Sequence, residues 1–297
     1  MRGRIRENPP YFCVMPLPKY STFGMSDDAI TIDRFKRYYS NNPHLQPTHK
    51  HSFYHLLYFT EGGGSHTIDF VGFPVRPGMI YFMQPGQMHK WLFDGPVDGY
   101  VVNFSPTFFE HQGIDAKVTD RFSFFGAEIK DHVVQLSERS RAGAEQLFAA
   151  MLAEAERPDG LSRLRTATLL LQLFITVQRD HFPVTLPEAV GYNTTLLHNF
   201  RELVDKHFAS LRLPKDYAVM LYITPNHLNA LCKDLLGVPA GQVIRDRVML
   251  EAKRLLSNFD LPITEVARSL HFADSSYFIK FFKKYAGTTP DIFRKRA

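Results

Sequence analysis

Two segments near the C-terminus repeat one plan, in which a short helix, a tight turn and a second helix follow one another. The second helix begins after Thr224 in the first copy and after Asp274 in the second, and both residues are good N-caps. Pro225 suits the first helical position, where its missing N–H costs no hydrogen bond. The repeat predicts two helix-turn-helix units, over about residues 211–236 and 261–286.

A single long helix is predicted to separate the two units, over about residues 240–258. At 1.5 Å per residue, such a helix spans about 27 Å. Together with the widths of the flanking units, it would hold the two second helices roughly 34 Å apart, which is one turn of B-DNA. Both helices would then enter successive major grooves on one face of the duplex. The arrangement predicts a module that binds double-stranded DNA.

The charge of the chain is distributed unevenly. The 297 residues carry a formal net charge of +5, and residues 190–297 contain 16 Lys and Arg against 10 Asp and Glu. The remaining residues are therefore close to neutral. A basic half joined to a nearly neutral one is what attraction to a phosphate backbone requires, although a merely solvated surface would also account for it.

The linking helix and the second unit carry a specific sequence pattern. Its residues are Arg247, Ala252-Lys253-Arg254-Leu255-Leu256, Ile263, Val266-Ala267, Leu270, Phe272, Asp274, Ser276-Tyr277-Phe278, Phe281-Phe282-Lys283-Lys284, Gly287, Pro290 and Phe293-Arg294. The first unit follows the pattern more loosely, through Ala218, Ile223, Leu228 and Gly237. Over about 105 residues the chain thereby resembles the AraC/XylS family of bacterial transcription regulators. The resemblance implies a sequence-specific DNA-binding regulator, here expected to be an activator, with promoter DNA and RNA polymerase as partners.

The resemblance also implies DNA contacts, residue by residue. Base contacts fall on Asn226, Asn229, Ala230, Ser275, Ser276 and Lys280. Lys233, Lys283 and Lys284 complete the expected interface, the last two as contacts to phosphate. Asn pairs well with adenine and Lys with guanine, while Ser is adaptable. Capping or solvation of the helices is the alternative use of the same side chains.

Some positions depart from the family pattern. Tyr222 and His271 stand in turns where the family often has Gly, and His tolerates a left-handed backbone better than most residues. Ala230 has no polar reach, and Cys232 replaces a common aromatic core residue. The first unit is therefore expected to read its half-site more weakly than the second.

Short strands separated by turn formers dominate the N-terminal half. They are predicted over residues 53–60, 65–70, 74–76, 79–84 and 100–104. Turns rich in Gly or Pro lie between them. Many short strands at near-regular spacing indicate a sandwich or barrel.

The pattern then changes to helical. Helices are predicted over residues 137–156 and 161–181, joined by the turn Arg157-Pro158-Asp159-Gly160. The second helix carries an apolar stripe at helical steps, formed by Leu164, Thr168, Leu171 and Ile175. Core packing and a dimer seam would each use this stripe, and we expect a homodimer.

A second resemblance, to the cupin barrel, lies in the strand-rich half. It rests on His49-Lys50-His51 and on Gly78 followed by Pro85-Gly86-Gln87-Met88-His89. Metal-binding cupins take two His and a Glu from the first motif and a His from the second, and here His55 stands near the place of the Glu. The resemblance therefore implies that His49, His51, His55 and His89 are the candidate ligands for Zn, Fe or Cu.

Two uses of the barrel follow. In the favoured one, a closed pocket binds a small-molecule effector through His49, His51, His55, Gln87, His89 and Trp91. Its wall, or else the plain core, takes Phe53, Tyr58, Tyr81, Phe82, Trp91 and Phe104. The chain then has no metal, no cofactor and no catalytic residue, and it is not an enzyme. The alternative is a metal-dependent cupin enzyme fused to a DNA-binding tail; a constitutive architectural DNA-binding protein is a third interpretation.

These patterns predict an α+β multidomain chain, with an N-terminal cupin-like β-barrel and helical hairpin and a C-terminal all-α double helix-turn-helix. The expected segments are an N-terminal arm over residues 1–44, a ligand-sensing barrel over 45–135, the hairpin over 136–182, a linker over 183–189 and a DNA-binding domain over 190–297.

The sequence also bears on location. No run of eighteen apolar residues is present, and the basic start leads into Asn8-Pro9-Pro10 in place of an apolar signal core, so no membrane partner is expected. Cys13 and Cys232 are far apart and in no metal-like or redox-like spacing, which favours a reducing compartment. We expect a cytoplasmic protein that is nucleoid-associated when bound to DNA.

Overall fold

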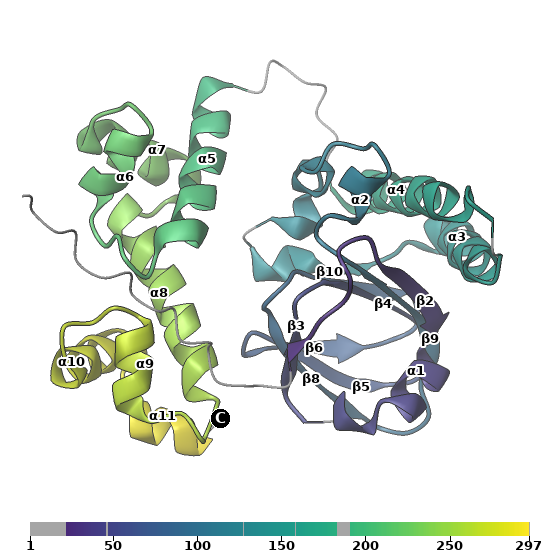
Figure 1. The fold of residues 1–297 in the computed structure, drawn as a ribbon, viewed down its shortest axis with the longest axis horizontal. Helices are drawn as coiled ribbons and strands as arrows, with labels where there is room; N and C mark the ends of the chain where they lie inside the picture. The colour runs from purple at the N-terminus through teal and green to yellow at the C-terminus, as the bar shows by residue number, and fades with distance from the viewer. Residues whose placement is uncertain (1–21, 46, 127, 158, 183–190, 297) are drawn as a thin grey trace, which may run out of the picture.

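The computed structural model describes residues 22–45, 47–126, 128–157, 159–182 and 191–296. Strands make up most of the N-terminal half, a pair of long helices covers it, and the C-terminal half is helical (Figure 1). The predicted α+β fold class is therefore confirmed. The predicted linker over residues 183–189 lies outside the described residues.

Two five-stranded sheets build the N-terminal half. The first has the order β1 (Thr22–Phe23), β3 (His49–His51), β8 (Met88–Phe93), β5 (Gly64–Ile68) and β6 (Val71–Val75). The second has the order β10 (Val133–Gln135), β7 (Met79–Met83), β4 (Tyr54–Glu61), β9 (Asp98–Phe104) and β2 (Ile30–Arg34). Neighbouring strands are antiparallel except for β1 and β3.

Strand β2 corrects one predicted boundary. It pairs with β9 from Ile30 opposite Phe104 to Arg34 opposite Tyr100, and helix α1 (Phe35–Asn41) and a 3-10 turn (Pro43–Leu45) follow it. The prediction of an N-terminal arm up to residue 44 is therefore wrong from residue 30 onward. Residues 30–34 form a run of only five residues without a strong turn signal before it, so their alternation of apolar and polar side chains was too short to predict a strand.

The second sheet is buried on both faces. Its inner face packs on the first sheet through side chains that include Leu57, Phe59 and Tyr81. Its outer face carries Leu56, Tyr58, Ile80, Phe82, Val102 and Phe104, which pack under the helical hairpin. Tyr58, Phe82 and Phe104 therefore do not line the inside of the barrel. A strand covered on both faces shows no polar alternation, so the sequence could not tell its two sides apart.

The helical hairpin consists of α3 (Glu138–Ala155) and α4 (Ser162–His181), which lie side by side over the second sheet (Figure 1). Helix α4 buries Ala167, Leu170, Phe174 and Val177 against it. Three residues of the predicted stripe lie outside that core, with Leu164 42% and Ile175 43% exposed and Thr168 exposed, whereas Leu171 is half-buried and packs against it. Core packing therefore accounts for Leu171 alone, and a dimer seam remains a prediction for the rest of the stripe.

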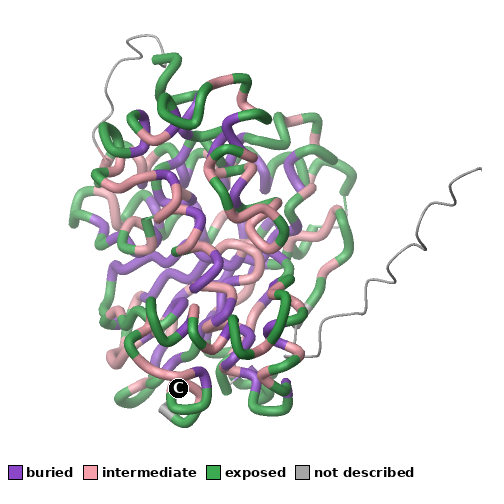
Figure 2. Tube along the Cα trace, turned by 90° about the vertical axis from the view of Figure 1, so that its left-hand side faces the viewer, coloured by how far each residue is buried: buried purple, intermediate pink, exposed green. Residues whose placement is uncertain are grey.

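Short elements connect the barrel to the hairpin. They are α2 (Phe108–His111) and the 3-10 turns Val118–Arg121, Ser123–Phe125 and Ile129–His132. Figure 2 shows the buried residues gathered in the interior and the exposed ones at the periphery.

The C-terminal half contains two small cores that share one helix. Its elements are α5 (Tyr192–His207), α6 (Pro214–Met220), α7 (Pro225–Leu236), α8 (Ala240–Leu256), α9 (Ile263–Ser269), α10 (Ser275–Ala286) and α11 (Pro290–Arg296). The start of α8 packs with α5, α6 and α7, and its end packs with α9, α10 and α11. The two predicted helix-turn-helix units and the helix between them are thus present. None of the described helices has the length and apolar character needed to cross a lipid bilayer.

The turns inside the two units have the same backbone conformation. Tyr222 has a φ of 56° and His271 a φ of 54°, so both residues lie in the left-handed region that favours Gly. Tyr222 is also 96% exposed, so packing of its side chain offsets little of the free-energy cost of the left-handed conformation. A single left-handed non-Gly residue costs about 1 kcal/mol.

We predict that Tyr222→Gly raises the free energy of unfolding by about 1 kcal/mol, because it removes this strain. The measurement is urea unfolding of the full chain followed by circular dichroism. Met220→Gly, at the end of α6, is the matched control and should lower stability by a similar amount. Unchanged or reduced stability of Tyr222→Gly would show that the Tyr side chain makes a compensating contact.

Candidate nucleic-acid interface and sensor core

Helices α7 and α10 are built alike at both ends. The Thr224 hydroxyl accepts a hydrogen bond from the His227 N–H at 3.1 Å, and an Asp274 carboxylate oxygen accepts one from the Tyr277 N–H at 2.7 Å. Gly237 and Gly287 end the helices in the left-handed region with a φ of 72° each. The predicted N-caps are thus confirmed, and local sequence signals define both helices.

Most of the predicted DNA contacts lie on the outer faces of these two helices. Asn226, Ala230, Lys233, Ser276, Lys280, Lys283 and Lys284 are exposed, and Ser275 is half-buried. Among the described residues, no salt bridge involves any of the four lysines. Their charges are therefore available to phosphate.

Asn229 differs from the other predicted contacts. It is half-buried, and its Oδ1 accepts a hydrogen bond from the Ala240 N–H at 3.1 Å. It thereby caps the first turn of α8, which otherwise lacks a side-chain cap. The structure gives Asn229 an internal contact, because the residue lies at the edge of the helix where α7 meets α8.

Two further exposed side chains, which no sequence pattern predicted as DNA contacts, flank the same faces. His227 and Tyr277 occupy equivalent positions in the first turns of α7 and α10, and Tyr277 is 59% exposed. Both follow a predicted base contact directly. Their position in the sequence could have predicted this exposure, because neighbouring side chains in the first turn of a helix point outward together.

The predicted histidines meet in the interior of the barrel. His49 and His51 come from β3, His55 from β4 and His89 from β8, and each is at most 3% exposed. Ring centroids lie 4.1 Å apart for His49 and His89, 4.7 Å for His51 and His55, and 5.2 Å for His55 and His89. One ring nitrogen of each of His49, His51 and His89 lies within 4.8 Å of the other two.

His66 on β5 belongs to the same cluster and was missed. It is fully buried, and its Nε2 lies 3.2 Å from His89 Nδ1 within hydrogen-bond distance. Residues 64–68 alternate, and His66 shares the inner face with Ile68. That alternation could have placed the ring inside the barrel. We use the name histidine cluster for His49, His51, His55, His66 and His89.

Burial governs the charge state of the histidine cluster. It lowers the pKa of all five rings, that of His55 to about 3, and the neighbouring rings lower most of them further. The rings are therefore neutral at pH 7. The Nε2 of His55, the Nδ1 of His66 and the Nε2 of His89 are buried without a hydrogen-bond partner among the described residues.

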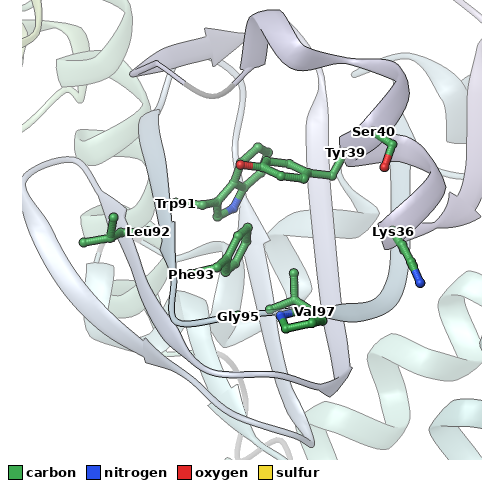
Figure 3. Close-up of a pocket in the computed structure, with 9 residues that line it drawn as sticks. Lys36, Tyr39, Ser40, Trp91, Leu92, Phe93, Gly95 and Val97 are labelled. Atoms are coloured by element: carbon green, nitrogen blue, oxygen red, sulfur yellow. The ribbon is translucent and has the colours of Figure 1, made fainter.

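Trp91 lies between the histidine cluster and an open hollow. Its ring centroid lies 4.9 Å from that of His89, and its Nε1 is buried without a partner among the described residues. The hollow has a volume of about 550 Å³, with Tyr39 and Phe93 beside Trp91 and Lys36 at its rim (Figure 3). Trp91 thus separates the cluster from solvent at this end of the barrel.

Trp91 and Gln87 are the two predicted ligand contacts outside the histidine cluster, and Gln87 is hydrogen-bonded at the β5–β6 turn. Its Nε2 donates to an Asp69 carboxylate oxygen at 3.0 Å, and its Oε1 accepts from the Gln84 N–H at 2.7 Å. Gln87 therefore supports the β5–β6 turn, and its expected contact with a ligand in the cluster is not what the structure provides. Sequence proximity to His89 misled here, because Gln87 precedes β8 and its side chain is held by Asp69 and by the Gln84 N–H.

The β5–β6 turn connects the barrel to the DNA-binding half. Asp69 and Phe70 form its two-residue loop with φ values of 45° and 73°. Both Asp69 oxygens accept hydrogen bonds from the Arg254 guanidinium of α8, at 2.8 and 2.6 Å. The side chains of Arg254 and Asp69 are only 11% and 3% exposed. Phe70 lies against Phe293 of α11, with ring centroids 5.7 Å apart.

Comparisons with known proteins agree with this division of the chain. Residues 217–296 match a family model described as a helix-turn-helix domain, and residues 32–174 match one described as an AraC-like ligand binding domain. The chain belongs to the AraC family of transcription regulators. It is therefore a DNA-binding transcription regulator with an N-terminal ligand-binding domain.

Individual relatives are distant. The HTH-type transcriptional activator RhaR of Cronobacter sakazakii is 24% identical over 84% of this chain and 86% of that protein. The HTH-type transcriptional regulator YijO of Escherichia coli is 27% identical over 44% and 46%. Among solved structures, the C-terminal domain of AraT from Geobacillus stearothermophilus is 27% identical over 36% of this chain and 89% of that one, with a TM-score of 0.33. ToxT from Vibrio cholerae is 14% identical over 90% and 97%, with a TM-score of 0.46.

The different surroundings of two Asn residues on α7 give a prediction. Asn229→Ala should lower the free energy of unfolding by about 1 kcal/mol, because α8 loses its cap. Asn226→Ala should leave stability unchanged and weaken DNA binding, because its side chain is exposed on the outer face. Thermal unfolding and anisotropy of a labelled duplex measure the two effects. The reverse assignment, with Asn226→Ala destabilising, would contradict the structure.

Proposed function

We propose that the protein binds promoter DNA as a homodimer through the outer faces of α7 and α10, and that a small effector in the barrel controls this binding. The proposal rests on one observation: the recognition helices α7 and α10 are equivalent, and both pack on the same helix, α8. Both are capped, end in a left-handed Gly and present exposed polar or basic side chains. Base readout then comes from the first turns, and Lys233, Lys283 and Lys284 hold phosphate.

Activation of transcription, with RNA polymerase as a further partner, is the mode of regulation we infer. RhaR of Cronobacter sakazakii, to which the chain is similar, is a transcriptional activator. We place the protein in the cytoplasm, associated with the nucleoid when it is bound to DNA. We also infer that it is a regulator without enzymatic activity, since its relatives are regulators.

Lys280 and Lys283 should respond differently to truncation. Lys280→Ala should cost about 1–3 kcal/mol and relax preference at one base position, whereas Lys283→Ala should weaken binding to all sequences and reduce its salt dependence. Binding to a target duplex and to its point variants, measured at several salt concentrations, separates the two effects. Lys130→Ala, on the exposed surface of the sensor half, is the control. An equal loss on every sequence for Lys280→Ala would make it a phosphate contact.

The exposed stripe of α4 supports the homodimer. Leu164 and Ile175 lie on one face of the helix with Thr168 and Leu171, and of these four residues only Leu171 packs against the core. A second copy would bury it and place two DNA-binding halves on adjacent half-sites, which increases the effective concentration of the second.

We predict that the double variant Leu164→Glu, Ile175→Glu is monomeric in sedimentation experiments, because charged side chains disrupt an apolar seam. Lys130→Glu, an exposed charge change outside α4, should leave the dimer intact. A monomeric parent protein at micromolar concentration would overturn the dimer.

A further inference from the structure

Arg212 connects the two helix-turn-helix units without using α8. The residue lies in the loop between α5 and α6, in the first unit. Its Nη2 donates a hydrogen bond to the Leu270 carbonyl, at the end of α9 in the second unit. Its guanidinium carbon also lies 4.5 Å from the centroid of the Phe272 ring, within the range of a cation–π interaction. One side chain of the first unit therefore makes two contacts with the turn of the second.

The loop that contains Arg212 is fixed in the first unit. Tyr217 of α6 is fully buried, and its hydroxyl donates a hydrogen bond to the Leu211 carbonyl at 3.0 Å. Leu211 itself packs against the core around α7. On the other side of Arg212, Leu213 is the N-cap residue of α6. The backbone on both sides of Arg212 is therefore held by the unit that contains α7, so the guanidinium moves with that unit.

The Phe272 ring is fixed in the same way to the second recognition helix. It packs against three aromatic rings of α10, at centroid distances of 5.8, 5.2 and 5.1 Å from Tyr277, Phe278 and Phe281. These three residues lie in the first two turns of α10. Through one ring, Arg212 of the first unit thus contacts the part of α10 that is expected to read bases.

The charge of Arg212 has no carboxylate partner in the described part of the chain, where no salt bridge involves this residue. The side chain is half-buried, and this burial lowers its pKa. Removing part of a cation from water costs free energy that an apolar side chain would not cost. The Leu270 carbonyl, one of the last of α9, and the Phe272 ring offset this cost. Because both lie in the second unit, Arg212 favours the arrangement of the two units in which these contacts form.

Phe208 makes a different kind of contact between the units. It follows α5 and packs against both the core around α7 and the core around α10. The guanidinium carbon of Arg247 on α8 lies 4.0 Å from its ring centroid. Apolar packing of this kind has no preferred direction, whereas a hydrogen bond weakens steeply when its angle changes. Phe208 therefore holds the two units together, and Arg212 restricts the angle between them.

We propose that Arg212 is a positioning residue that fixes the angle between α7 and α10 and thereby the half-site spacing that the regulator accepts. Helix α8 runs between the two units and holds them apart (Figure 1). Each unit packs on one end of α8, so a second contact away from this helix is needed to restrain rotation of one unit against the other. Two helices enter successive major grooves only when their separation and angle match the repeat of the duplex. The effect on spacing rests on the proposed function, whereas the contact within the chain does not.

The geometry is tested on the full chain without DNA. Spin labels on Asp234→Cys and Lys284→Cys, at equivalent exposed positions of α7 and α10, report the distance between the two helices by double electron–electron resonance. Cys13 is replaced by Ser, whereas Cys232 is kept, because burial raises the pKa of its thiol to about 11. Dilution with unlabelled protein restricts the signal to pairs within one chain. The parent protein should give one narrow distance distribution, and Arg212→Met a broader or shifted one.

Three further variants distinguish positioning from a loss of charge. Lys215→Met removes an exposed cation from the neighbouring helix α6 and should leave the distance distribution unchanged. Arg212→Lys keeps the charge but lacks the planar fork, so it should restore the parent distribution only in part. Phe272→Leu removes the stacking surface, and combining it with Arg212→Met should add little, because both changes act on one contact.

The outcomes of the distance measurement are separable from a folding defect, because circular dichroism verifies that each variant is folded. If Arg212→Met does not fold, Phe272→Leu replaces it in the comparison with Lys215→Met. A distance distribution of Arg212→Met equal to that of the parent, or an equal change in Lys215→Met, would overturn the proposal.

The effect on DNA is tested with a duplex that the parent protein selects from a random library. Base pairs are inserted or removed between its half-sites, and the affinities are measured by anisotropy. In Arg212→Met, the preference for the selected spacing should fall about tenfold, the effect expected from one hydrogen bond to a charged group. In Lys215→Met it should stay unchanged.

Two results of the DNA measurement have different meanings. An unchanged preference in Arg212→Met together with a broadened distance distribution would overturn the role of Arg212 in spacing. A parent protein that selects no duplex would overturn the proposed function, while the distance measurement would still decide whether Arg212 positions α10.

Discussion

The ion pair between Arg254 and Asp69 fixes how the two halves of the protein meet. Both side chains are almost fully buried, and burying two charges is costly unless geometry and further hydrogen bonds compensate. Here the guanidinium contacts both carboxylate oxygens, and Gln87 and the Met88 N–H supply the remaining bonds. The carboxylates of Asp69 and Glu251 raise the pKa of Arg254 despite its burial. Because Asp69 and Phe70 also hold left-handed conformations, this turn persists only while its contacts do.

Helix α8 extends that constraint to the DNA-binding surface. Ile244 belongs to the core around α7, and Leu255 and Leu256 belong to the core around α10. Arg247 further links α8 to Asp205 of α5 and to Glu251, one turn before Arg254. A displacement of the β5–β6 turn therefore acts on a rigid element that both recognition helices share. The change in DNA affinity is then limited by how differently the effector binds the two arrangements.

Local chemistry explains what the sequence could predict. Thr224, Pro225 and Gly237 define α7 within a few residues, so the double repeat and its boundaries followed directly. His49, His51, His55 and His89 were grouped correctly through motif spacing. Nothing local reveals that Asn229 caps α8 or that Gln87 supports Asp69, because both contacts form only after distant elements pack. Arg254 and Asp69 are 185 positions apart, and no local sequence pattern predicts their ion pair.

The two recognition helices differ in exposed positive charge, and α8, on which both of them pack, determines how this difference affects DNA binding. Helix α10 presents Lys280, Lys283 and Lys284, whereas α7 presents Lys233 next to Asp234 and the apolar Ala230. We therefore expect phosphate attraction, and with it most of the affinity, to come from α10. In the proposed mode of binding, α8 would hold α7 at a fixed distance from a bound α10, so even weak contacts of α7 would add to affinity as intramolecular steps. A protein that binds in this way discriminates between targets through the spacing of the half-sites as much as through base contacts. On a target with altered spacing, α7 would lose its contacts with DNA while those of α10 stay unchanged.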